Sequence, residues 1–353
     1  TIFAVVCAGL YPILHLGRPW VFYWLVPYPN TFGLFPQFRS PLDWDFFAIG
    51  TYFTISLIFW FIGLIPDLAS LRDNARSGFQ RLLYGVLSLG WNGSTKAWQR
   101  YQRAYLLLAA LSFPLVLSVH STIALDFAVA QVPGWNNTIM PPYFVAGAVF
   151  AGFAMVLILG VPLRKALKFE HLITLRHLDN AAKLMLATGM IVVYGYFIEV
   201  FIAWYSGVEA ERYMIWNRMF GPHGKYFWAL IFCNFVAIQP LWFRKVRQSP
   251  LALFVIALAV SVGMWLERFV IFVVSLTRDY LPSSWADYVS TFWDWSLFIG
   301  SLGLFSTLFF VFIRLLPSIA TAETKETAYH DHHHGSDAFE TIRMEYYNAE
   351  ETA

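Results

Sequence analysis

Residues 1–20 read TIFAVVCAGLYPILHLGRPW, and their pattern recurs along most of the chain. An apolar run continues through His15 and then gives way to Gly-Arg-Pro-Trp at residues 17–20. Glycine and proline end helices, and tryptophan favours the interface between membrane and water. The stretch therefore predicts a membrane helix whose last turn carries an imidazole. An ionisable group inside the apolar layer is costly and usually functional, so His15 is the first candidate site residue.

The composition indicates a membrane protein. The 353 residues are 58% hydrophobic and 19% aromatic, and only 13% are charged. Soluble domains carry about a quarter charged residues, so a soluble globular protein is excluded. A backbone that crosses lipid must satisfy its hydrogen bonds internally, which favours helices. We expect membrane lipids, and no nucleic acid, among the partners of the chain.

Eight apolar segments have the length and the flanking residues of membrane spans. They cover residues 1–16, 44–66, 104–129, 140–163, 181–206, 225–243, 250–276 and 290–316. The sequence therefore predicts an all-α, polytopic transmembrane helix bundle over residues 1–319, followed by a polar cytoplasmic tail at 320–353. The first run is shorter than the roughly 20 residues of a full span, so we expect more helices upstream of Thr1.

The basic residues predict the orientation of the chain. Fifteen Lys and Arg fall in one set of alternate loops and at the end of the last segment, and six fall in the other set. The positive-inside rule places the first set in the cytoplasm. The connection 66–102 and the C-terminus then lie inside, and His15 lies near the outer face. Residues 78–98 mix apolar and basic side chains and are expected on the membrane surface.

Resident metal cofactors are not expected. Cys7 and Cys233 lie far apart in apolar runs, and no Cys-x-x-Cys motif occurs, which argues against iron–sulfur clusters, c-type haem and thiolate zinc sites. A b-type haem needs two histidines at similar depth, and only His15 and His120 lie inside the predicted layer. The run His-Asp-His-His-His at 330–334 has metal-binding residue types, but a solvated tail is the preferred interpretation.

Three polar groups fall at the outer level of the predicted bundle. His15 ends the first segment, Asp45 begins the second, and Asp126 lies at the outer end of the third. Because successive segments run in alternate directions, these side chains are expected at one face. A histidine with two carboxylates can take two protons from a bound hydroquinone. The alternative is that Asp45 caps its helix and Asp126 is an interfacial loop residue.

A second set of polar residues is a candidate proton path. Its members are His120, Asp179, Tyr196, Glu199, Glu267, Arg268 and Asp294. Tyr196 and Glu199 are three residues apart and therefore share one side of a helix. Asp294 is the expected partner of Arg268. A purely structural ion-pair cluster is the alternative interpretation of Asp294, Arg268 and Glu267.

The chain resembles a known family in several short motifs. They are His-Leu-Gly-Arg-Pro-Trp at 15–20, Phe-Tyr-Trp at 22–24, Pro-Tyr-Pro at 27–29, Pro114 with His120 and Asp126, and Met-Pro-Pro-Tyr at 140–143. These motifs resemble the NrfD / polysulfide-reductase membrane-subunit family, and most of all the quinol-oxidising ActC subunits of alternative complex III. The resemblance is strongest at the first motif. It implies a quinol site near the non-cytoplasmic face, formed here by His15, Asp45 and Asp126.

The resemblance also implies a function and partners. Members of the family hold no cofactor of their own, bind a quinol, and pass electrons to a docked iron–sulfur subunit. We therefore expect a membrane subunit of a bacterial respiratory complex that oxidises menaquinol, with clusters and haems only in iron–sulfur, multihaem cytochrome c and other partner subunits. Proton translocation is a further candidate role.

The same resemblance suggests which residues surround the quinol. Arg18, Trp20 and Phe46 are expected near its ring, although such aromatic residues are also common interfacial anchors. Two alternative functions stay open. One is a quinone-reducing subunit of a polysulfide-reductase-like complex, and the other is a proton or ion transporter without redox chemistry.

Overall fold

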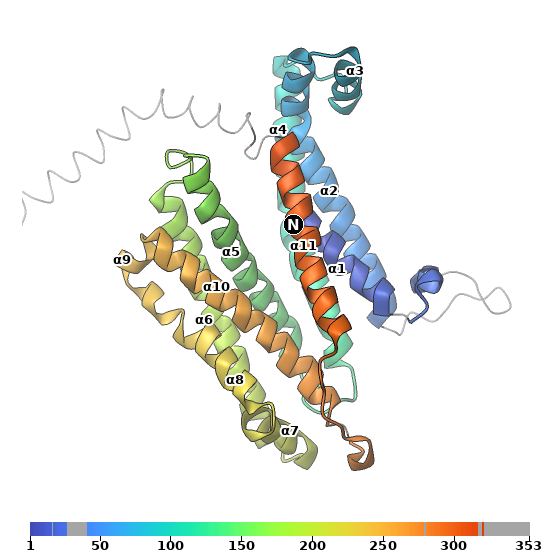
Figure 1. Cartoon of the computed structure of the whole chain (residues 1–353), viewed down its shortest axis with the longest axis vertical. Helices are drawn as coiled ribbons and strands as arrows, with labels where there is room; N and C mark the ends of the chain where they lie inside the picture. The colour runs from blue at the N-terminus through green and yellow to red at the C-terminus, as the bar shows by residue number, and fades with distance from the viewer. Residues whose placement is uncertain (16, 27–40, 279, 317–319, 321–353) are drawn as a thin grey trace, which may run out of the picture. The chain divides into compact units, whose positions relative to one another are not determined.

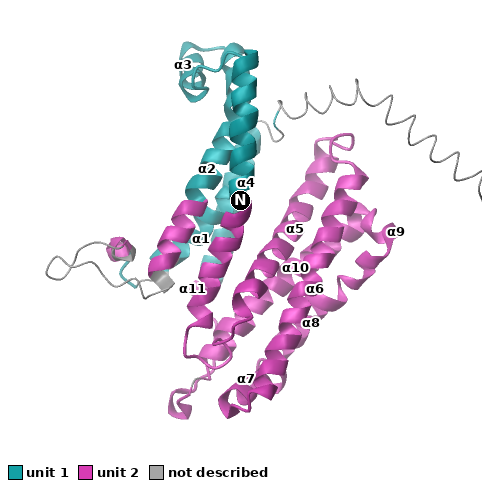
Figure 2. Ribbon diagram, turned by 180° about the vertical axis from the view of Figure 1, so that it is seen from behind, with its two compact units in different colours: residues 1–19, 53–112, 295–353 teal, residues 20–52, 113–294 magenta. Residues whose placement is uncertain are grey.

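The computed structural model describes residues 1–15, 17–26, 41–278, 280–316 and 320, and every regular element in these ranges is helical (Figure 1). The chain divides into two compact units (Figure 2). Unit 1 comprises residues 1–19, 53–112 and 295–353, and unit 2 comprises residues 20–52 and 113–294. The predicted tail at 320–353 lies outside the described residues apart from Ala320.

Six described helices are long and apolar enough to cross a membrane. They are α2 (Pro41–Asp73), α4 (Thr95–Ala128), α5 (Met140–Ala166), α6 (Leu175–Tyr205), α10 (Pro250–Phe269, prolonged by a π-helical turn, η5, Val270–Val274) and α11 (Phe292–Leu315). The shorter elements are α1 (Ile2–His15), η1 (Pro19–Leu25), α3 (Gly78–Leu87), α7 (Glu209–Phe220), α8 (Gly224–Ile231), η3 (Phe232–Val236), η4 (Gln239–Trp242), α9 (Arg244–Arg247) and η6 (Pro282–Ser284). The prediction of an all-α, polytopic transmembrane bundle is confirmed.

Two of the eight predicted spans differ from this set. The run 1–16 forms the short helix α1. The run 225–243 is α8 followed by a π-helical turn, η3, and a short 3₁₀ turn, η4, instead of one regular helix. Pro240 lies at the start of η4 and has no backbone N–H to continue an α-helical ladder. Apolar composition predicted the run, but it carried no information about these breaks in helical geometry.

Helix α2 extends further than the sequence predicts. The apolar segment was expected to end at Pro66, but the helix continues to Asp73 with Pro66 inside it. Leu64, Leu68 and Ala69 are all buried, so packing on both sides of the proline supports the helix. The expected connection 66–102 is therefore reduced to residues 74–94, which contain α3.

Unit 1 is joined by contacts between α1, α2, α4 and α11. Tyr11 of α1 donates a hydrogen bond to Ser301 Oγ of α11 over 2.9 Å. The rings of Trp60 in α2 and Phe312 in α11 lie 5.8 Å apart, centroid to centroid. Phe59 of α2 similarly contacts Tyr105 of α4, with ring centroids 4.6 Å apart. These contacts are mostly aromatic, as expected for helices in a chain so rich in rings.

The hydrophobic core of unit 2 lies between α5, α6, α8 and α10, with the end of α4 packed against it. Phe150 of α5 is fully buried. A Cβ on Gly189 of α6 would lie only 2.8 Å from the Phe150 ring, so the glycine allows the two helices to approach closely. This close packing is what positions the polar side chains described next.

Candidate functional site

Asp45 and Asp126, two of the predicted quinol-site residues, lie close enough in unit 2 for their carboxyl groups to interact electrostatically. Two ionised carboxylates that interact in this way repel each other, so the pair favours a proton on one of its members. Both residues are half-buried, and Oδ1 of each is buried without a hydrogen-bond partner in the described part of the chain. The pair is therefore a place where protons and a further polar ligand can be held.

The end of α4 is held firmly around this pair. Phe127, next to Asp126, lies 4.8 Å from the Trp135 ring and 4.8 Å from the Phe272 ring, centroid to centroid. Its ring also contacts Phe144 of α5 at 5.5 Å. Asp45 stands close to the start of α2. The alternative that Asp126 is a loop residue is wrong, because Asp126 lies within α4.

The other predicted quinol-site residues are His15, Arg18, Trp20 and Phe46. His15 is the last residue of α1, in unit 1, and its side chain lies outside the described part of the structure. Its approach to the two carboxyl groups stays a prediction. Arg18 and Trp20 are exposed, and Trp20 is 71% exposed. Phe46 is 39% exposed and packs edge-on against Phe47.

A second group of polar side chains, the central cluster, is buried in unit 2. Tyr196 of α6 donates a hydrogen bond to Glu267 Oε2 of α10 over 2.5 Å. Asn234 of η3 donates to the Tyr196 oxygen over 2.7 Å. The hydroxyl of Tyr143 in α5 is within electrostatic reach of Tyr196 and Glu267. Arg268 completes the cluster, with its Nη2 atom 3.5 Å from Glu267 Oε1.

Arg268 connects the central cluster to His120. Its guanidinium lies over the Phe144 ring, 3.9 Å from the centroid, which is the geometry of a cation–π contact. Its positive charge also acts on the imidazole of His120. The ion pair that Arg268 makes is with Glu267, and its predicted pairing with Asp294 stays a prediction. Asp294 accepts hydrogen bonds from the backbone nitrogen and the hydroxyl of Thr291. Those bonds place Asp294 at the start of α11, where a carboxylate stabilises the helix end.

Four buried atoms of the central cluster make no hydrogen bond to the described residues. They are Tyr143 Oη, Asn234 Oδ1, Glu267 Oε1 and Arg268 Nη1. Buried polar groups almost always have a partner, in the protein or in bound water. So many unsatisfied atoms in one place indicate a site for ordered water.

Glu199 belongs to a separate group, the Arg218 cluster. Arg218 of α7 is 2% exposed and donates from Nη1 to Glu199 Oε1 over 2.5 Å. Its Nη2 atom donates to the Gly134 carbonyl over 3.2 Å and to Ser275 Oγ over 2.7 Å. Gly134 has a φ of +78°, and a Cβ there would lie 2.8 Å from Arg218 Nη2. The loop after α4 is thus fixed to α7 by one buried cation.

Glu211 lies beside the Arg218 cluster, in α7 and outside the membrane-spanning helices. Burial raises the pKa of the Glu211 carboxyl group above its usual value. A hydrogen bond from the Gly134 backbone N–H and the charge of Arg218 act in the opposite direction, and the charge of Glu199 adds to the increase. This carboxyl group is therefore a pH-sensitive neighbour of a buried ion pair.

Asp179 belongs to a third group, which lies near the start of α6. It pairs with Lys183 over 2.6 Å and with Arg247 of α9 over 2.7 Å. Arg247 also donates to the carbonyls of Leu241 and Trp242, each over 2.8 Å. This arrangement ties α9 and η4 to α6, which favours a structural role for Asp179.

The predicted proton path is therefore brought together only in part. Tyr196, Glu267 and Arg268 are joined by direct contacts, and His120 lies within electrostatic range of Arg268. Glu199, Asp179 and Asp294 each make other contacts. Sequence reasoning missed Asn234, although an amide inside an apolar run was a usable signal. It also counted Arg218 among loop cations, and no local signal marked its burial.

No group of three or more His, Cys, Asp and Glu side chains in the described residues could hold a metal ion. The absence of a resident cofactor stays a prediction. The run 330–334 lies outside the described residues. The central cluster contains an acid, two phenols, an amide and a guanidinium, which are suited to moving or holding protons.

These features define an integral membrane protein with titratable side chains buried between its helices. A sequence profile of the family described as "Polysulphide reductase, NrfD" matches residues 1–278, and the chain belongs to this family. The chain is also 27% identical over 158 residues to a putative membrane subunit of a dimethyl sulfoxide reductase from Halobacterium salinarum. This similarity covers 44% of the chain and 32% of the relative, so the chain spans about a third of that protein's length. The family resemblance is confirmed, and the finer likeness to alternative complex III stays a prediction.

Proposed function

We propose that this chain is the quinone-reacting membrane subunit of a bacterial respiratory oxidoreductase complex and that it oxidises menaquinol, as in alternative complex III. The observation that carries the proposal is the electrostatic interaction between Asp45 and Asp126, near the start of α2 and the end of α4. Membership of the NrfD family supports a place in a redox complex. A paired carboxyl site at a helix-bundle end suits a ligand that gives up protons.

The chemistry of quinol oxidation fits such a site. A quinol becomes a quinone by losing two protons and two electrons. The ionised member of the Asp45–Asp126 pair accepts one proton, and His15 is the proposed acceptor of the other. The electrons pass to an iron–sulfur subunit on the non-cytoplasmic side, and from there to multihaem cytochromes of the complex. Arg18, Trp20 and Phe46 are proposed to border the ring.

The central cluster is proposed as a proton relay. Tyr196, Glu267 and Asn234 are already joined by hydrogen bonds, and the unsatisfied atoms around them suit bound water that would extend the chain. Arg268 is positioned to stabilise the ionised form of Glu267 and to influence His120. A proton could thus pass along this set while quinol reacts at the carboxyl pair.

Two other functions are the alternatives. Quinone reduction in a polysulfide-reductase-like complex would use the same carboxyl pair with protons moving in the reverse direction. A proton or ion transporter is favoured by the two π-helical turns at Phe232–Val236 and Val270–Val274, because transporters contain interrupted helices near their sites. Electron transfer by the assembled complex distinguishes both from quinol oxidation.

The test of the quinol site is quinol-dependent electron transfer in the assembled complex. Asp45→Asn and Asp126→Asn are each expected to slow it about 10²-fold, the usual scale for losing a general base. His15→Phe is expected to abolish quinol binding as well. Asp43→Asn is the matched control, because two residues turn the side chain by roughly 200° around α2. If both carboxyl variants assemble and turn over at the wild-type rate, the proposal is wrong.

The proton relay needs a separate measurement. The complex is reconstituted into vesicles, and protons moved per electron are followed with a pH-sensitive dye. Glu267→Gln removes the ionisable group while keeping size, so the proton ratio should fall while electron transfer is largely retained. Asp287→Asn, at an exposed ion pair, is the control. An unchanged proton ratio in the Glu267 variant contradicts the relay.

A further inference from the structure

Helix α3 has an apolar face that the described residues do not cover. Phe79, Leu82, Leu83 and Val86 follow a spacing of three and four residues and therefore share one side of the helix. Their exposed fractions are 74%, 67%, 43% and 65%. None of the residues of α3 is buried. A helix of this kind, next to the end of a membrane span, is suited to the membrane surface.

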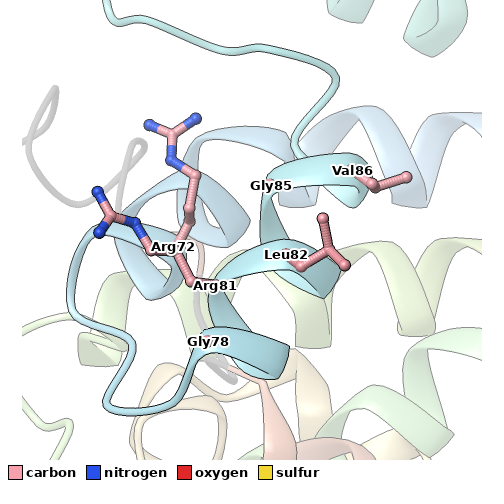
Figure 3. Close-up of a pocket in the computed structure, with 6 residues that line it drawn as sticks. All are labelled: Arg72, Gly78, Arg81, Leu82, Gly85 and Val86. Atoms are coloured by element: carbon pink, nitrogen blue, oxygen red, sulfur yellow. The ribbon is translucent and has the colours of Figure 1, made fainter.

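An open groove runs along one flank of α3 (Figure 3). It has a volume of about 500 Å³, and its lining residues are Arg72, Gly78, Arg81, Leu82, Gly85 and Val86. Figure 3 shows the two guanidinium groups on one side of α3 and the side chains of Leu82 and Val86 on the other. The groove thus offers positive charge at one edge and aliphatic surface at the other.

Arg72 is held in place at this groove. Its Nε donates to Asp73 over 2.8 Å, and its Nη1 donates to Ser88 Oγ over 3.4 Å and to the Trp91 carbonyl over 3.1 Å. A guanidinium has five N–H donors, so the two on Nη2 are left without a partner among the described residues. An arginine fixed in this way is prepared to bind an anion with little loss of side-chain entropy.

Two glycines keep the groove open. A Cβ on Gly85 would lie 3.7 Å from the Cδ atom of Arg72, and one on Gly78 would meet no atom within 4 Å. The two residues are seven apart and lie on the same side of α3, so no side chain fills the space between Arg81 and Leu82. Asp73 is the nearby opposing charge, and it is engaged by Arg72.

We propose that this groove binds an anionic phospholipid, with the phosphate at Arg72 and Arg81 and the acyl chains beside Leu82 and Val86. Two guanidinium groups complement a phosphate, and a phosphatidylglycerol head adds no positive charge to compete with them. The exposed apolar face of α3 enters the acyl region next to the lipid. The site is independent of the proposed quinol chemistry, since it lies in unit 1 at the other end of α2 from Asp45.

Native mass spectrometry of the purified complex during phosphatidylglycerol titration tests the site. Arg72→Gln with Arg81→Gln should weaken binding at least tenfold, and the same titration with phosphatidylcholine should show weaker binding to the unaltered chain. Arg76→Gln with Arg103→Gln removes the same charge outside the groove and should leave binding unchanged. Equal losses in both double variants would mean a general charge effect and would overturn the proposal. If millimolar inorganic phosphate competed for the groove as strongly as added phosphatidylglycerol does, the proposal would also be overturned.

A second variant keeps the charges but fills the groove. Gly85→Leu should reduce phosphatidylglycerol binding while α3 remains helical. The orientation of α3 is checked with spin labels at Leu82→Cys and Gln80→Cys, in a chain lacking Cys7 and Cys233. The label at position 82 should be accessible to oxygen in the lipid, and the label at position 80 to a water-soluble nickel reagent. Equal aqueous access at both positions, or unchanged lipid binding by the glycine variant, would contradict the site.

Discussion

The long helices of this protein differ sharply in how much of each is buried. In α5, α6 and α10 of unit 2, 33%, 33% and 44% of the most apolar stretch is buried. In α2, α4 and α11, which all extend into unit 1, the values are 6%, 6% and 0%. Their mean hydropathies are similar, at 2.5, 1.9 and 2.0 against 2.0, 1.9 and 2.1. Hydropathy thus marks which helices enter lipid, whereas burial marks which of them hold a polar core.

The glycines show the same difference at atomic scale. A Cβ on Gly195 of α6 would lie 2.5 Å from the Tyr143 ring, and a Cβ on Gly263 of α10 would overlap the Asn234 side chain. A Cβ on Gly300 or Gly303 of α11 would meet no atom within 4 Å. Glycine is therefore required for helix contact in unit 2, and it has no such packing role in the described part of α11.

The largest expected effect comes from separating a buried ion pair. Arg218→Leu leaves the Glu199 carboxylate and the Gly134 carbonyl without their partner, so the free energy of unfolding should fall by about 3–5 kcal/mol. Glu199→Leu added to Arg218→Leu should recover part of this loss, because no charge is then left unpaired. Asp287→Asn, in a pair whose carboxylate side chain is 58% exposed, should change stability by about 0–1 kcal/mol. Denaturant titration in lipid–detergent mixtures measures all three.

The contrast between buried and exposed charges would be contradicted by equal losses of stability at the two ion pairs, both of which lie in unit 2. The same titration would also contradict it if the double variant were less stable than Arg218→Leu alone. In either case burial in unit 2 would not determine the contribution of a charge pair.

A smaller effect is expected from adding one methyl group to the helix contact. Gly263→Ala places a Cβ on Asn234 Oδ1 and 2.7 Å from Cys233 Cβ, so η3 must shift. Overpacking of this kind costs about 1–3 kcal/mol. Gly300→Ala is the matched control in α11, where the added methyl group meets open space and should stabilise the helix by about 0.5–1 kcal/mol. Thermal unfolding of both variants gives the sign. A neutral Gly263 variant would show that α10 and η3 are less tightly packed than described.

The smallest expected effect is the pH dependence due to Glu211. Because burial raises its pKa in the folded state, folding favours the protonated form. Its stabilising contribution is complete below the unfolded-state pKa and is lost as the pH rises through the folded-state pKa. Glu211→Gln should therefore flatten the decline of stability above the ordinary glutamate pKa of about 4.3. Unfolding followed from pH 4 to pH 8 measures this slope. A variant with an unchanged slope would mean that the Gly134 N–H and Arg218 fully compensate burial.

Much of the fold could be predicted from the sequence. Long apolar runs are sufficient to predict helical spans, because lipid offers the backbone no hydrogen-bond partners. Six of the eight predicted segments contain long helices. The 15–20 motif was enough to indicate the NrfD family, because it combines several residues in a fixed order. The same reasoning failed where helical geometry changes without a change in hydrophobicity, as at Phe232–Val236.

The sequence predicted neighbours in the candidate site only for residues near helix ends, whose level in the bundle follows from helix direction. Alternating helix directions bring Asp45 and Asp126 to one level from their sequence positions alone, and in the structure their carboxyl groups lie close enough to interact. The partners of deeper groups depend on how each helix is rotated about its axis. Glu199 and Tyr196 share one side of α6, yet they bind Arg218 and Glu267 respectively.

The sequence by itself determined that this chain is helical, enters a membrane and belongs to its family, because those properties follow from composition and from short ordered motifs. The tertiary structure decided which polar groups meet. Tyr196 and Glu267 are 71 residues apart, and their contact depends on glycines that let α5, α6 and α10 approach. Such contacts are set by the packing of side chains from several helices, and no local pattern in the sequence encodes that packing.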